Sequence, residues 1–508
     1  MADNKIVYMN IQNLLKINAQ KYPDKTAIIF QERPISFLEV KDKASGVGNY
    51  LQAKGVAKGD KVALFLPNTA DTIYSILGVL CLGACIVPLD YMLTEEEVIN
   101  FINHSQAKLL ITQPKKGIDF NRVKDSCPSL KEVITELKYE EGGETSTEIS
   151  ESDLAAIFYT SGSTGHPKGV MLSYGHFDNP PETINHFLGV SDKDIFLCGG
   201  VPFSHVGGLV YILLMLKFAS GLVLMERFHP LEFLKNIQKH KATIFCIVPA
   251  MYVAILSLKE YDKFDLASLR FAVVFGAPSS PVLLKRFHKA CPKAELSNGW
   301  GLTETAAPNC MLPPGVDKIQ SIGKFAPGMS AKIVDENEKP VTVGQRGELL
   351  VKGKAVMLGY YKESQLTKEV MTADGWFKTG DVAILDEEGL YYIVGRKKEM
   401  IKVAGEIVFS PEVEAVIQRH PKVTEAAVIG VSDRLRGEVP KAFIVVKESQ
   451  VIDEQELKEF LKEHLAHFKI PHYFEFIKEL PRNRTGKVDK QTLKRSASAL
   501  RHQHTKEE

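Results

Sequence analysis

The sequence predicts an α/β protein, with a large N-terminal domain of parallel-rich α/β sheets plus a small β subdomain, followed by a small α+β C-terminal domain. Three observations predict this. Short apolar runs alternate with helical segments over roughly the first three hundred residues, which is typical of parallel sheets. From about Ser330 the chain changes to short strands separated by turns, and after Arg396 it returns to alternating strands and helices. At 508 residues, it is long enough for about three domains or subdomains.

The N-terminal part starts with a capping box, in which Ser36 and Glu39 precede apolar residues at helical spacing. A helix is therefore predicted over residues 36–52, and another over residues 74–82. Short apolar runs closed by Pro, Asn or Asp, or followed by other breaks, are typical of buried strands in a parallel sheet. Such runs cover residues 62–68, 84–90, 107–112, 242–249 and 269–278.

Two longer segments of the N-terminal part carry their own signals. The apolar stretch 206–225 is interrupted by Lys217 and by Gly221, so it predicts a buried helix followed by a strand rather than a membrane span. The segment 136–152 is acidic, polar and rich in turn residues, and a solvent-exposed loop is expected there.

The segment from Ser330 to Arg396 predicts a small antiparallel subdomain, because its strands follow one another with turns about every eight to twelve residues. These strands are expected at residues 331–335, 347–353, 382–386 and 390–395. Beyond Arg396, residues 410–420 form an amphipathic pattern with Pro in the first helical turn. Strands at 426–431 and 441–446 and a helix at 453–464 complete the C-terminal domain.

Composition excludes several function classes. Sixty-three basic and 62 acidic residues give a net charge of +1, so nothing draws the chain to nucleic acid or to an anionic membrane. The seven cysteines are scattered and have no metal-binding spacing, so reduced thiols and no metal site are expected at them. The N-terminus lacks the apolar core of a signal peptide, and no transmembrane segment is predicted, so the expected location is cytoplasmic.

The most informative segment spans residues 159–170 and reads YTSGSTGHPKGV. It is too rich in Gly, Ser, Thr and Pro for regular structure, and its exposed backbone N–H groups can form a nest for phosphate oxygens. A Walker A loop is excluded, because Lys168 follows Pro167 and precedes Gly169 rather than Ser or Thr. Taken alone, the segment also fits a Ser/Gly-rich surface turn. Its candidate phosphate-binding residues are Thr160, Ser161, Gly162, Ser163, Thr164, Gly165 and Lys168.

The same string resembles, almost residue for residue, the phosphate loop of the AMP-forming adenylating enzymes, a superfamily of acyl-CoA synthetases, adenylation domains of peptide synthetases and luciferases. Five further segments resemble motifs of this superfamily: PFSHVGGL (202–209), GAP (276–278), NGWGLTET (298–305), WFKTGDVAILDEEGLYYIVGRKKEMIKVAGE (376–406) and PRNRTGKVDK (481–490). The resemblance covers about residues 10–495. It implies an N-terminal adenylate-forming domain over 1–394, with the β subdomain at about 330–394, a hinge at 395–398 and a mobile C-terminal domain over 399–508.

The resemblance also implies a nucleotide site. Trp300 stands where the family usually has Tyr, and its flat side chain is expected to lie against adenine, with a core Trp as the alternative. Thr303 is expected to donate to the α-phosphate and Glu304 to hold Mg²⁺. Asp381 matches the aspartate that accepts from the ribose hydroxyls, and Arg396 matches the ribose and phosphate arginine; a turn Asp and a surface Arg are the alternatives. The other implied ATP/AMP-binding residues are Gly276, Ala277, Pro278, Asn298, Gly299, Gly301 and Lys487.

For the acid, the resemblance implies that Lys487 is the catalytic lysine between the acid's carboxylate and the α-phosphate. His205 matches the aromatic position that closes the carboxylate end of the acyl pocket, and a core histidine is the alternative. The adjacent Gly207 and Gly208 are expected to keep the pocket wall thin. The implied pocket consists of Phe203, His205, Val206, Gly207, Gly208, Val274, Phe275, Gly301 and Ala306.

For the thioester step, the resemblance implies that Lys398 is the hinge residue and that Lys402, Gly405 and Glu406 present to CoA. The chain departs from many acyl-CoA ligases at Ala404, where they often carry Lys, so one contact to CoA is in question.

The implied function is ATP-dependent conversion of a monocarboxylic acid to an acyl-adenylate with release of pyrophosphate, followed by transfer to CoA. The segment PFSHVGGL (202–209) contains no Asp that could pair with the ammonium group of an amino acid, which argues against amino-acid adenylation. Apolar pocket residues favour a fatty acid, with an aryl acid such as cinnamate or benzoate as the alternative. A non-catalytic nucleotide or acyl-CoA sensor is the alternative of another class. The implied cofactor is Mg²⁺, the implied substrates are ATP, CoA and the acid, and a homodimer is left open.

Overall fold

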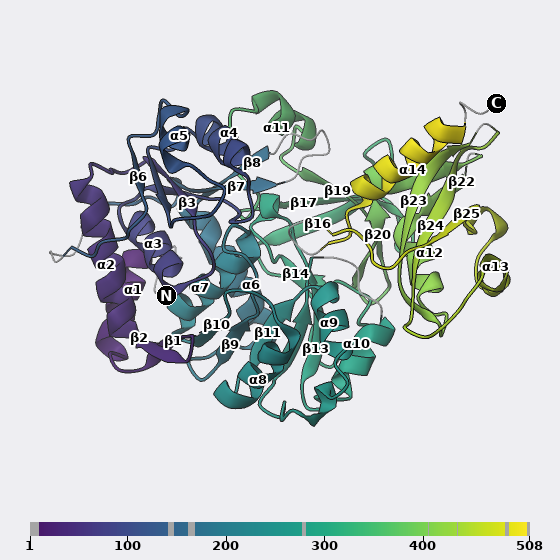
Figure 1. Cartoon of the computed structure of the whole chain (residues 1–508), viewed down its shortest axis with the longest axis horizontal. Coiled ribbons are helices and arrows are strands. Elements are labelled where there is room, and N and C mark those ends of the chain that lie inside the picture. Colours follow the sequence, from purple (N-terminus) through teal and green to yellow (C-terminus); the bar gives the residue numbers. More distant parts are fainter. Residues whose placement is uncertain are drawn as a thin grey trace.

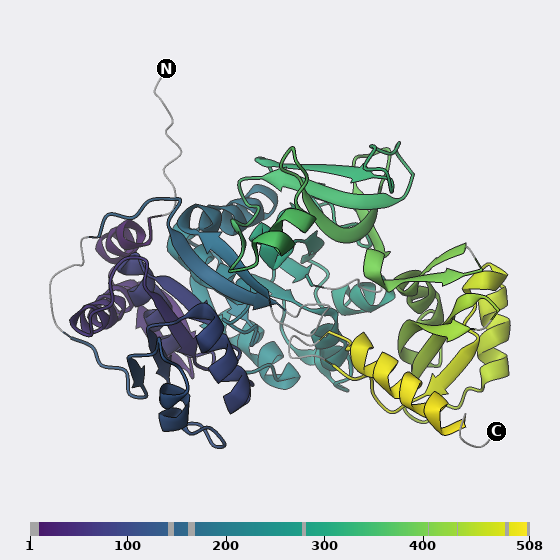
Figure 2. The same cartoon turned by 90° about the horizontal axis from the view of Figure 1, so that it is seen from above.

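The structure is a computed structural model that describes residues 10–140, 147–160, 168–276, 281–404, 406–433, 435–482 and 487–504. It is an α/β structure with a large N-terminal domain and a small C-terminal domain that lies beside it (Figure 1). This confirms the fold class predicted from the sequence. Seen from above, the antiparallel β subdomain forms a third body next to both (Figure 2).

The first sheet of the N-terminal domain has nine strands in the order β15-β14-β13-β12-β11-β9-β10-β1-β2. Its central strands, from β13 to β1, are all parallel, as expected for alternating strands and helices. The strands are β1 (Thr26–Phe30), β2 (Arg33–Ser36), β9 (Ile195–Cys198), β10 (Gly221–Leu224), β11 (Ile244–Ile247), β12 (Phe271–Val274), β13 (Glu295–Trp300), β14 (Cys310–Met311) and β15 (Lys324–Phe325).

The second sheet has seven strands in the order β18-β8-β7-β4-β3-β5-β6. Strands β6 to β7 are parallel, whereas β7 and β8 are antiparallel neighbours in which Thr160 pairs with Lys168. The candidate phosphate loop therefore joins two adjacent strands. The strands are β3 (Lys61–Phe65), β4 (Cys85–Pro88), β5 (Leu109–Thr112), β6 (Glu132–Ile134), β7 (Leu154–Thr160), β8 (Lys168–Ser173) and β18 (Gly359–Tyr360).

Helices cover both sheets. Helices α4 and α5 pack on the second sheet, and α8, α9 and α10 pack on one face of the first. Helix α7 is buried on nearly all sides in the core that the two sheets share, as expected for a helix that is apolar all round. The N-terminal helices are α1 (Ile11–Lys21), α2 (Phe37–Ala53), α3 (Ala70–Cys81), α4 (Glu95–Ser105), α5 (Phe120–Asp125), α6 (Asn179–Leu188), α7 (Val206–Phe218), α8 (Pro230–His240), α9 (Pro249–Leu256) and α10 (Pro281–His288).

The β subdomain is an antiparallel sheet, as the sequence predicted, and its four strands have the order β16-β17-β19-β20. The C-terminal domain contains a five-stranded sheet with its own core. Their elements are β16 (Met329–Val334), β17 (Gly347–Gly353), β19 (Phe377–Leu385), β20 (Tyr391–Arg396), β21 (Met400–Val403), β22 (Glu406–Phe409), β23 (Val423–Asp433), β24 (Gly437–Val446), β25 (Tyr473–Phe476), α11 (Ser364–Val370), α12 (Ser410–Ile417), α13 (Glu454–Lys462) and α14 (Lys490–His504).

Several local expectations can be compared with the structure. The stretch 206–225 is a helix followed by a strand, as predicted, and within the described ranges no helix is both long and apolar enough to cross a membrane. The capping box at Ser36 is only half formed. Ser36 accepts from the Glu39 backbone N–H, but the Glu39 carboxylate pairs with Arg33 at 2.5 Å instead of reaching back to the cap.

Candidate active site

The catalytic lysine expected from the sequence lies at the junction of the two domains. Lys487 lies in the chain between Arg482 and Val488, which form a short bridge just before α14, and the N-terminal end of α14 points toward the N-terminal domain in Figure 1. A Cβ atom placed on Gly276 would lie 4.0 Å from Lys487 Nζ. The chain thus brings residues that are more than two hundred positions apart together at the domain junction, and we call this place the cleft. Surrounding protein and the nearby Arg396 guanidinium lower the pKa of Lys487, although solvent reaches its side chain.

Asp381 and Arg396, which are expected to bind the ribose, lie close enough to Lys487 to interact with it electrostatically. They are directly opposite each other on β19 and β20, and Arg396 Nε lies 2.8 Å from Asp381 Oδ1. Asp381 is 3% exposed, and burial raises its pKa against the opposing effects of Arg396 and Trp300. The backbone of Asp381 is held as well, because its N–H donates to Thr379 Oγ1 at 3.0 Å.

Trp300 makes a contact that sequence reasoning missed. Its indole Nε1–H donates to Asp381 Oδ2 at 2.8 Å, so each oxygen of this carboxylate has a fixed donor within the protein. The ring of Phe325 packs edge-on against the indole, which is only 7% exposed. Trp300 therefore has the contacts of a buried core residue and little free surface. Packing of adenine on its face stays a prediction.

Glu304 lies in the short 3-10 helix η3 (Thr303–Thr305), together with Thr303. The Tyr360 hydroxyl donates to Glu304 Oε1 at 3.0 Å, and the Met357 N–H donates to the Glu304 backbone oxygen at 2.8 Å. Burial and the neighbouring Glu304 carboxylate raise the pKa of Tyr360, so its hydroxyl stays a donor.

These contacts bear on the expected Mg²⁺. In the part of the chain that the structure describes, no three His, Cys, Asp or Glu side chains come together as a metal cluster. A magnesium ion in proteins is often held by only one or two carboxylates plus substrate phosphates. The half-buried Glu304 carboxylate and the Thr303 hydroxyl fit that kind of site, in which the nucleotide supplies the other ligands.

Cations surround the place where phosphates are expected. Lys168, at the start of β8, lies over the ring of Tyr360 with Nζ 5.3 Å from the ring centre. Lys398, predicted only as a hinge residue, lies in the 3-10 helix η4 (Lys397–Glu399), where burial and the positive charges of Arg396 and Lys168 lower its pKa. Such a group of cations favours a polyphosphate. Five of the loop residues expected to bind phosphate, Ser161, Gly162, Ser163, Thr164 and Gly165, lie outside the described residues, as do Ala277 and Pro278.

His205 lies at the start of α7, close enough to Lys487 for the two to interact electrostatically. Burial, aided by the positive charge of Lys487, lowers the pKa of His205 to about 4. The imidazole is therefore neutral at physiological pH. This fits a side chain that closes one end of a substrate space and does not fit a second cation for the carboxylate.

The expected acyl pocket is corrected in part. Val274 and Ala306 are 0% and 1% exposed, and Val274 packs into the core on the face of β12 that α9 and α10 cover. Phe203 is likewise buried, and Val206 nearly so. Val274 is thereby removed from the expected pocket, because its side chain lies on the face of β12 that α9 and α10 cover, which its apolar character could not reveal. For Phe203, Val206 and Ala306 a place in the pocket stays a prediction.

The two glycines of the second motif differ from each other. A Cβ on Gly208 would lie 2.2 Å from the Pro202 carbonyl oxygen, so Gly208 is required for close packing and is not a pocket wall. Among the residues that the structure describes, a Cβ on Gly207 would meet only Val201 Cγ1, at 3.8 Å, so these residues leave open space in front of Gly207. We refer to this as the space in front of Gly207.

The glycines of the segment NGWGLTET (298–305) are also packing residues. A Cβ on Gly299 would lie 1.9 Å from the ring of Phe275, and one on Gly301 would lie 2.5 Å from Ala307 Cβ. The side chain of Asn298 donates to the Ile319 carbonyl oxygen at 3.1 Å. This segment is therefore shaped to let Phe275 cover β13, next to Gly276 and the cleft.

The residues expected to contact CoA do not lie with the other expected site residues. Lys402 and Glu406 are exposed on the hairpin β21–β22, and Gly405 lies outside the described residues. The Lys402 N–H donates to Glu438, and Ala404, at a φ of 50°, donates its N–H to the Arg436 carbonyl oxygen. Both contacts are within the C-terminal domain, so a role with CoA stays a prediction.

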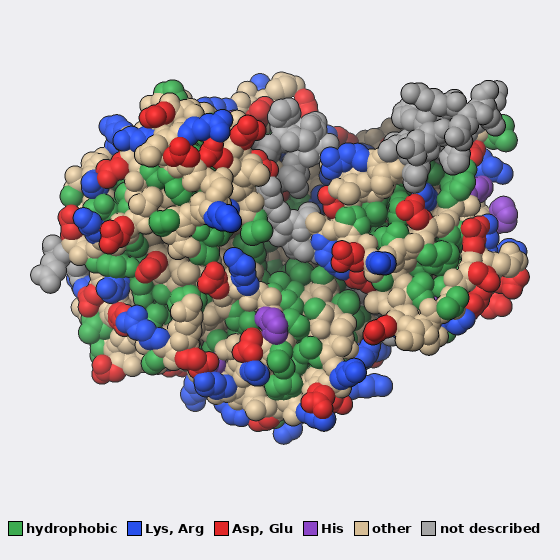
Figure 3. Space-filling model, in the orientation of Figure 1, with side chains coloured by type: hydrophobic (Ala, Val, Ile, Leu, Met, Phe, Trp, Pro, Cys, Tyr) green, Lys and Arg blue, Asp and Glu red, His purple; other side chains and the backbone are tan. Residues whose placement is uncertain are grey.

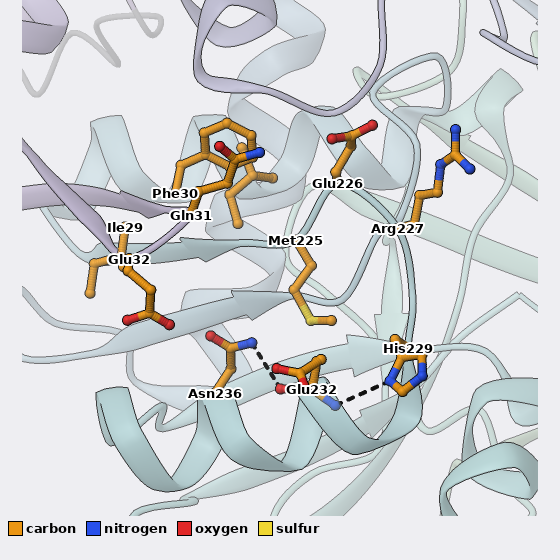
Figure 4. Close-up of a pocket in the computed structure, with 11 residues that line it drawn as sticks. Ile29, Phe30, Gln31, Glu32, Met225, Glu226, Arg227, His229, Glu232 and Asn236 are labelled. Carbon is orange, nitrogen blue, oxygen red and sulfur yellow. Dashed lines mark hydrogen bonds between the residues drawn. The ribbon is translucent and has the colours of Figure 1, made fainter.

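A separate cavity lies away from this cleft, beside α8 and the β1–β2 turn (Figure 4). Among its lining residues are Glu32, Met225, Arg227, His229 and Asn236. Figure 4 shows two of its polar contacts: Asn236 Nδ2 donates to the Glu232 carbonyl oxygen, and the Glu232 N–H donates to His229 Nδ1. None of the described residues that are expected to bind a substrate lines this cavity.

Comparison with known families agrees with this geometry. Residues 15–361 match the family described as AMP-binding enzyme, and residues 412–487 match the AMP-binding enzyme C-terminal domain. The chain belongs to the AMP-binding enzyme family, and it is an AMP-forming acid–CoA ligase of the luciferase-like adenylate-forming superfamily.

Its relatives act on different acids. A long-chain-fatty-acid–CoA ligase of Bacillus subtilis is 33% identical over 95% of this chain and 94% of its own length. A 2-succinylbenzoate–CoA ligase of Bacillus licheniformis is also 33% identical, over 96% of this chain and all of its own. The crystal structure of the anthranilate CoA ligase AuaEII with anthranoyl-AMP superimposes with a TM-score of 0.88 at 27% identity, covering 96% of this chain and 97% of the other. ATP and CoA are therefore substrates, and the relatives leave the acid open.

We expect Trp300→Phe to raise the KM for ATP. The substitution keeps an aromatic ring but removes the N–H that holds Asp381 Oδ2. Loss of a hydrogen bond to a charged group weakens binding by about tenfold. Steady-state kinetics would show the increase in the KM for ATP, with the KM for the acid unchanged. The effect should shrink with 2′-deoxy- or 3′-deoxy-ATP, since Asp381 has fewer ribose hydroxyls to bind, and an equal effect with all three nucleotides would contradict the assignment.

Proposed function

We propose that this ligase activates a monocarboxylic acid with an apolar tail, a fatty acid in the first instance, and transfers it to CoA with release of AMP. The observation that carries the proposal is the distribution of charge around Gly276. Lys487 and the apolar Val248 both lie close to it, and the space in front of Gly207, two residues along the chain from His205, is bordered by the apolar Val201. The neutral His205 adds no charge. An acid with its carboxylate at Lys487 would extend its tail among groups that favour apolar carbon.

In the first half-reaction the carboxylate oxygen attacks the α-phosphorus of ATP and pyrophosphate leaves. Two anions must meet, so the residues nearby need to be cationic. Lys487 would lie between the acid and the α-phosphate, and Arg396, Lys168 and Lys398 would hold the phosphates. When bound, Mg²⁺ would be held by Glu304 and would neutralise charge on the leaving pyrophosphate. In the second half-reaction the CoA thiolate attacks the adenylate carbonyl, and AMP leaves.

An aryl acid is the alternative, and a second carboxylate is disfavoured. A dicarboxylate would bury its second charge among Val201, Gly207 and Val248, and an unpaired buried charge is very costly.

A cytoplasmic location and a homodimer stay proposals that rest on the sequence alone. Over the face in Figure 3, basic and acidic side chains are interspersed, as the near-zero net charge implies.

Acid-dependent ATP–pyrophosphate exchange would test the proposal. Monocarboxylates with apolar tails should support exchange, and CoA should then release AMP in proportion to thioester formed. Malonate and 2-succinylbenzoate should be poor substrates. Exchange with these dicarboxylates alone would contradict the proposed acid, and nucleotide binding without exchange for any acid would favour a sensor.

We expect Gly207→Phe to restrict the acid. Because Gly207 faces open space, a benzyl side chain would occupy that space without displacing the backbone. The longest and bulkiest of the acids that the wild type accepts should lose activity by about tenfold or more, while the smallest acids keep theirs. Exchange rates over a range of acids would show this. Gly208→Ala is the matched control, since its Cβ would collide with Pro202 and should lower thermal stability instead of changing selectivity. An unchanged preference in a stable Gly207→Phe variant would show that the tail lies elsewhere.

A further inference from the structure

Strands β9 and β11 separate just below the cleft. They are paired at Phe196–Ile244 and Leu197–Phe245, and no further pair follows toward their carboxyl ends. The Tyr211 hydroxyl, from α7, fills the first unpaired position. It donates to the Cys246 carbonyl oxygen at 2.8 Å and accepts from the Cys246 N–H at 3.1 Å. One side chain thus satisfies both backbone groups that the missing strand pairing leaves.

The space in front of Gly207 lies above this point. Gly207 and Tyr211 are four residues apart on α7, so they share one face of the helix. Val201 borders the space beside Gly207. Across from α7, Val248 directly follows β11. Its Cγ1 lies 3.5 Å from a Cβ placed on Gly276, next to Lys487. The lysine therefore marks the upper end of the space, and the phenol of Tyr211 marks its lower end.

The depth of the space follows from the strand. Val248 has an extended backbone, so it continues the line of β11. Cys246 lies two residues before Val248 along this line, farther into the space. At the rise of a parallel strand, two residues correspond to about 7 Å. Since an extended chain advances about 1.2 Å per bond, this is room for roughly six bonds, or one aromatic ring.

We propose that Tyr211 closes the acyl site and limits the ligase to compact acids, with tails of medium length or a single ring, and excludes long-chain fatty acids. The inference rests on the proposed function. Tyr211 is suited to this role because its ring packs against Phe196 and its hydroxyl makes two hydrogen bonds to Cys246. A longer tail would have to break these contacts to displace the ring. Tyr211 is thus a specificity-determining residue.

Kinetics on acids of increasing length would test this inference. For the wild type, kcat/KM in pyrophosphate exchange should rise to about hexanoate or octanoate, and benzoate should be accepted. It should fall by about tenfold or more at dodecanoate and palmitate, the usual consequence of overfilling a packed site. For Tyr211→Ala the optimum should move to longer acids, with a gain of about tenfold for dodecanoate.

Tyr252 offers a matched control. It is equally buried, and its hydroxyl also donates to a backbone carbonyl, that of Val273, but its ring packs with Phe245 and Phe287 in the core on the other face of β11. Tyr252→Ala should lower thermal stability about as much as Tyr211→Ala and leave the preference for acid length unchanged. Tyr211→Leu, which fills more of the site, should give an intermediate shift, and it replaces Tyr211→Ala if that variant does not fold.

The outcomes separate the two proposals. Exchange with palmitate as good as with hexanoate in the wild type would overturn the inference about Tyr211 and leave the proposed function intact. A Tyr211 variant that is folded, active and unchanged in its preference would overturn it as well. Absence of exchange with every monocarboxylate would instead overturn the proposed function.

Discussion

Lys487→Ala should abolish most adenylate formation while sparing thioester formation from supplied acyl-adenylate. In the structure Lys487 lies beside Gly276, at the junction where a carboxylate and the α-phosphate would meet. Removing a cation placed between two anions should cost about 3–4 kcal/mol of transition-state stabilisation, or about 10²–10³ in rate. Pyrophosphate exchange measures the first half-reaction, and CoA-dependent AMP release from synthetic acyl-adenylate measures the second.

Lys490→Ala is a suitable comparison, because Lys490 is a neighbouring lysine with a different role. Its ammonium pairs with Glu414 at 2.7 Å and lies 3.7 Å from Glu399, so it anchors the start of α14 within the C-terminal domain. Its loss should reduce stability and slow both half-reactions to a similar degree. If Lys487→Ala were equally slow in both half-reactions, the separate role of Lys487 would be wrong.

The lowered pKa of Lys487 adds a dependence on pH. The amine must be charged to offset the two anions, and burial and Arg396 move its pKa below the usual 10.5. The exchange rate should therefore decline as the pH rises through that lowered pKa, earlier than for an ordinary lysine. In Lys487→Arg the side chain stays charged at every accessible pH, so the decline should disappear from whatever activity remains.

The sequence predicted most of the fold, because the signals involved are local. Alternating apolar runs and helices predicted the parallel sheets, and turns at short intervals predicted the antiparallel subdomain. The apolar stretch with Lys217 and Gly221 predicted α7 and β10 correctly. The half-formed capping box at Ser36 shows the limit of such signals, since Arg33 competes for Glu39 through a contact that no motif records.

The site was predicted less evenly. The motifs identified four candidate site residues, and the structure places all four close together in the cleft. They are Asp381, Arg396, Glu304 and Lys487. Contacts between motifs could not be predicted in the same way. Tyr360 holds Glu304 from a strand that pairs with β8, and Trp300 holds Asp381 from the other large sheet.

The acyl side was predicted least well, because burial on one face of a strand or the other decides it. Val274 and Cys246 are both apolar residues near strand ends, yet Val274 points into the core beneath α9 whereas Cys246 lies beside Tyr211. Apolar character alone cannot distinguish the two faces of a strand that is covered on both sides. The difference between Gly207 and Gly208 likewise depends on where the Pro202 carbonyl lies.

Glu304→Gln should raise the magnesium requirement and slow adenylation by about a hundredfold at low magnesium. The substitution keeps the size of the side chain and removes its charge. Tyr360 occupies Glu304 Oε1 from one side, and in the part of the chain that is described no other carboxylates complete a metal cluster around it. The charge of Glu304 would then be the main contribution of the protein to holding a cation against the ATP phosphates. Titration of pyrophosphate exchange with Mg²⁺ would measure the shift.

Tyr360→Phe separates charge from position. It leaves the Glu304 charge in place and removes only the hydroxyl that fixes Oε1, while the ring beneath Lys168 is kept. Its magnesium titration should shift in the same direction as that of Glu304→Gln but by no more than about tenfold, the usual effect of one hydrogen bond to a charged group. Binding of Mg·ATP measured by calorimetry, without turnover, should weaken in the same order. A magnesium titration of Glu304→Gln that matches the wild type would mean that the ATP phosphates hold the ion without this carboxylate, and the assignment of Glu304 would then be wrong.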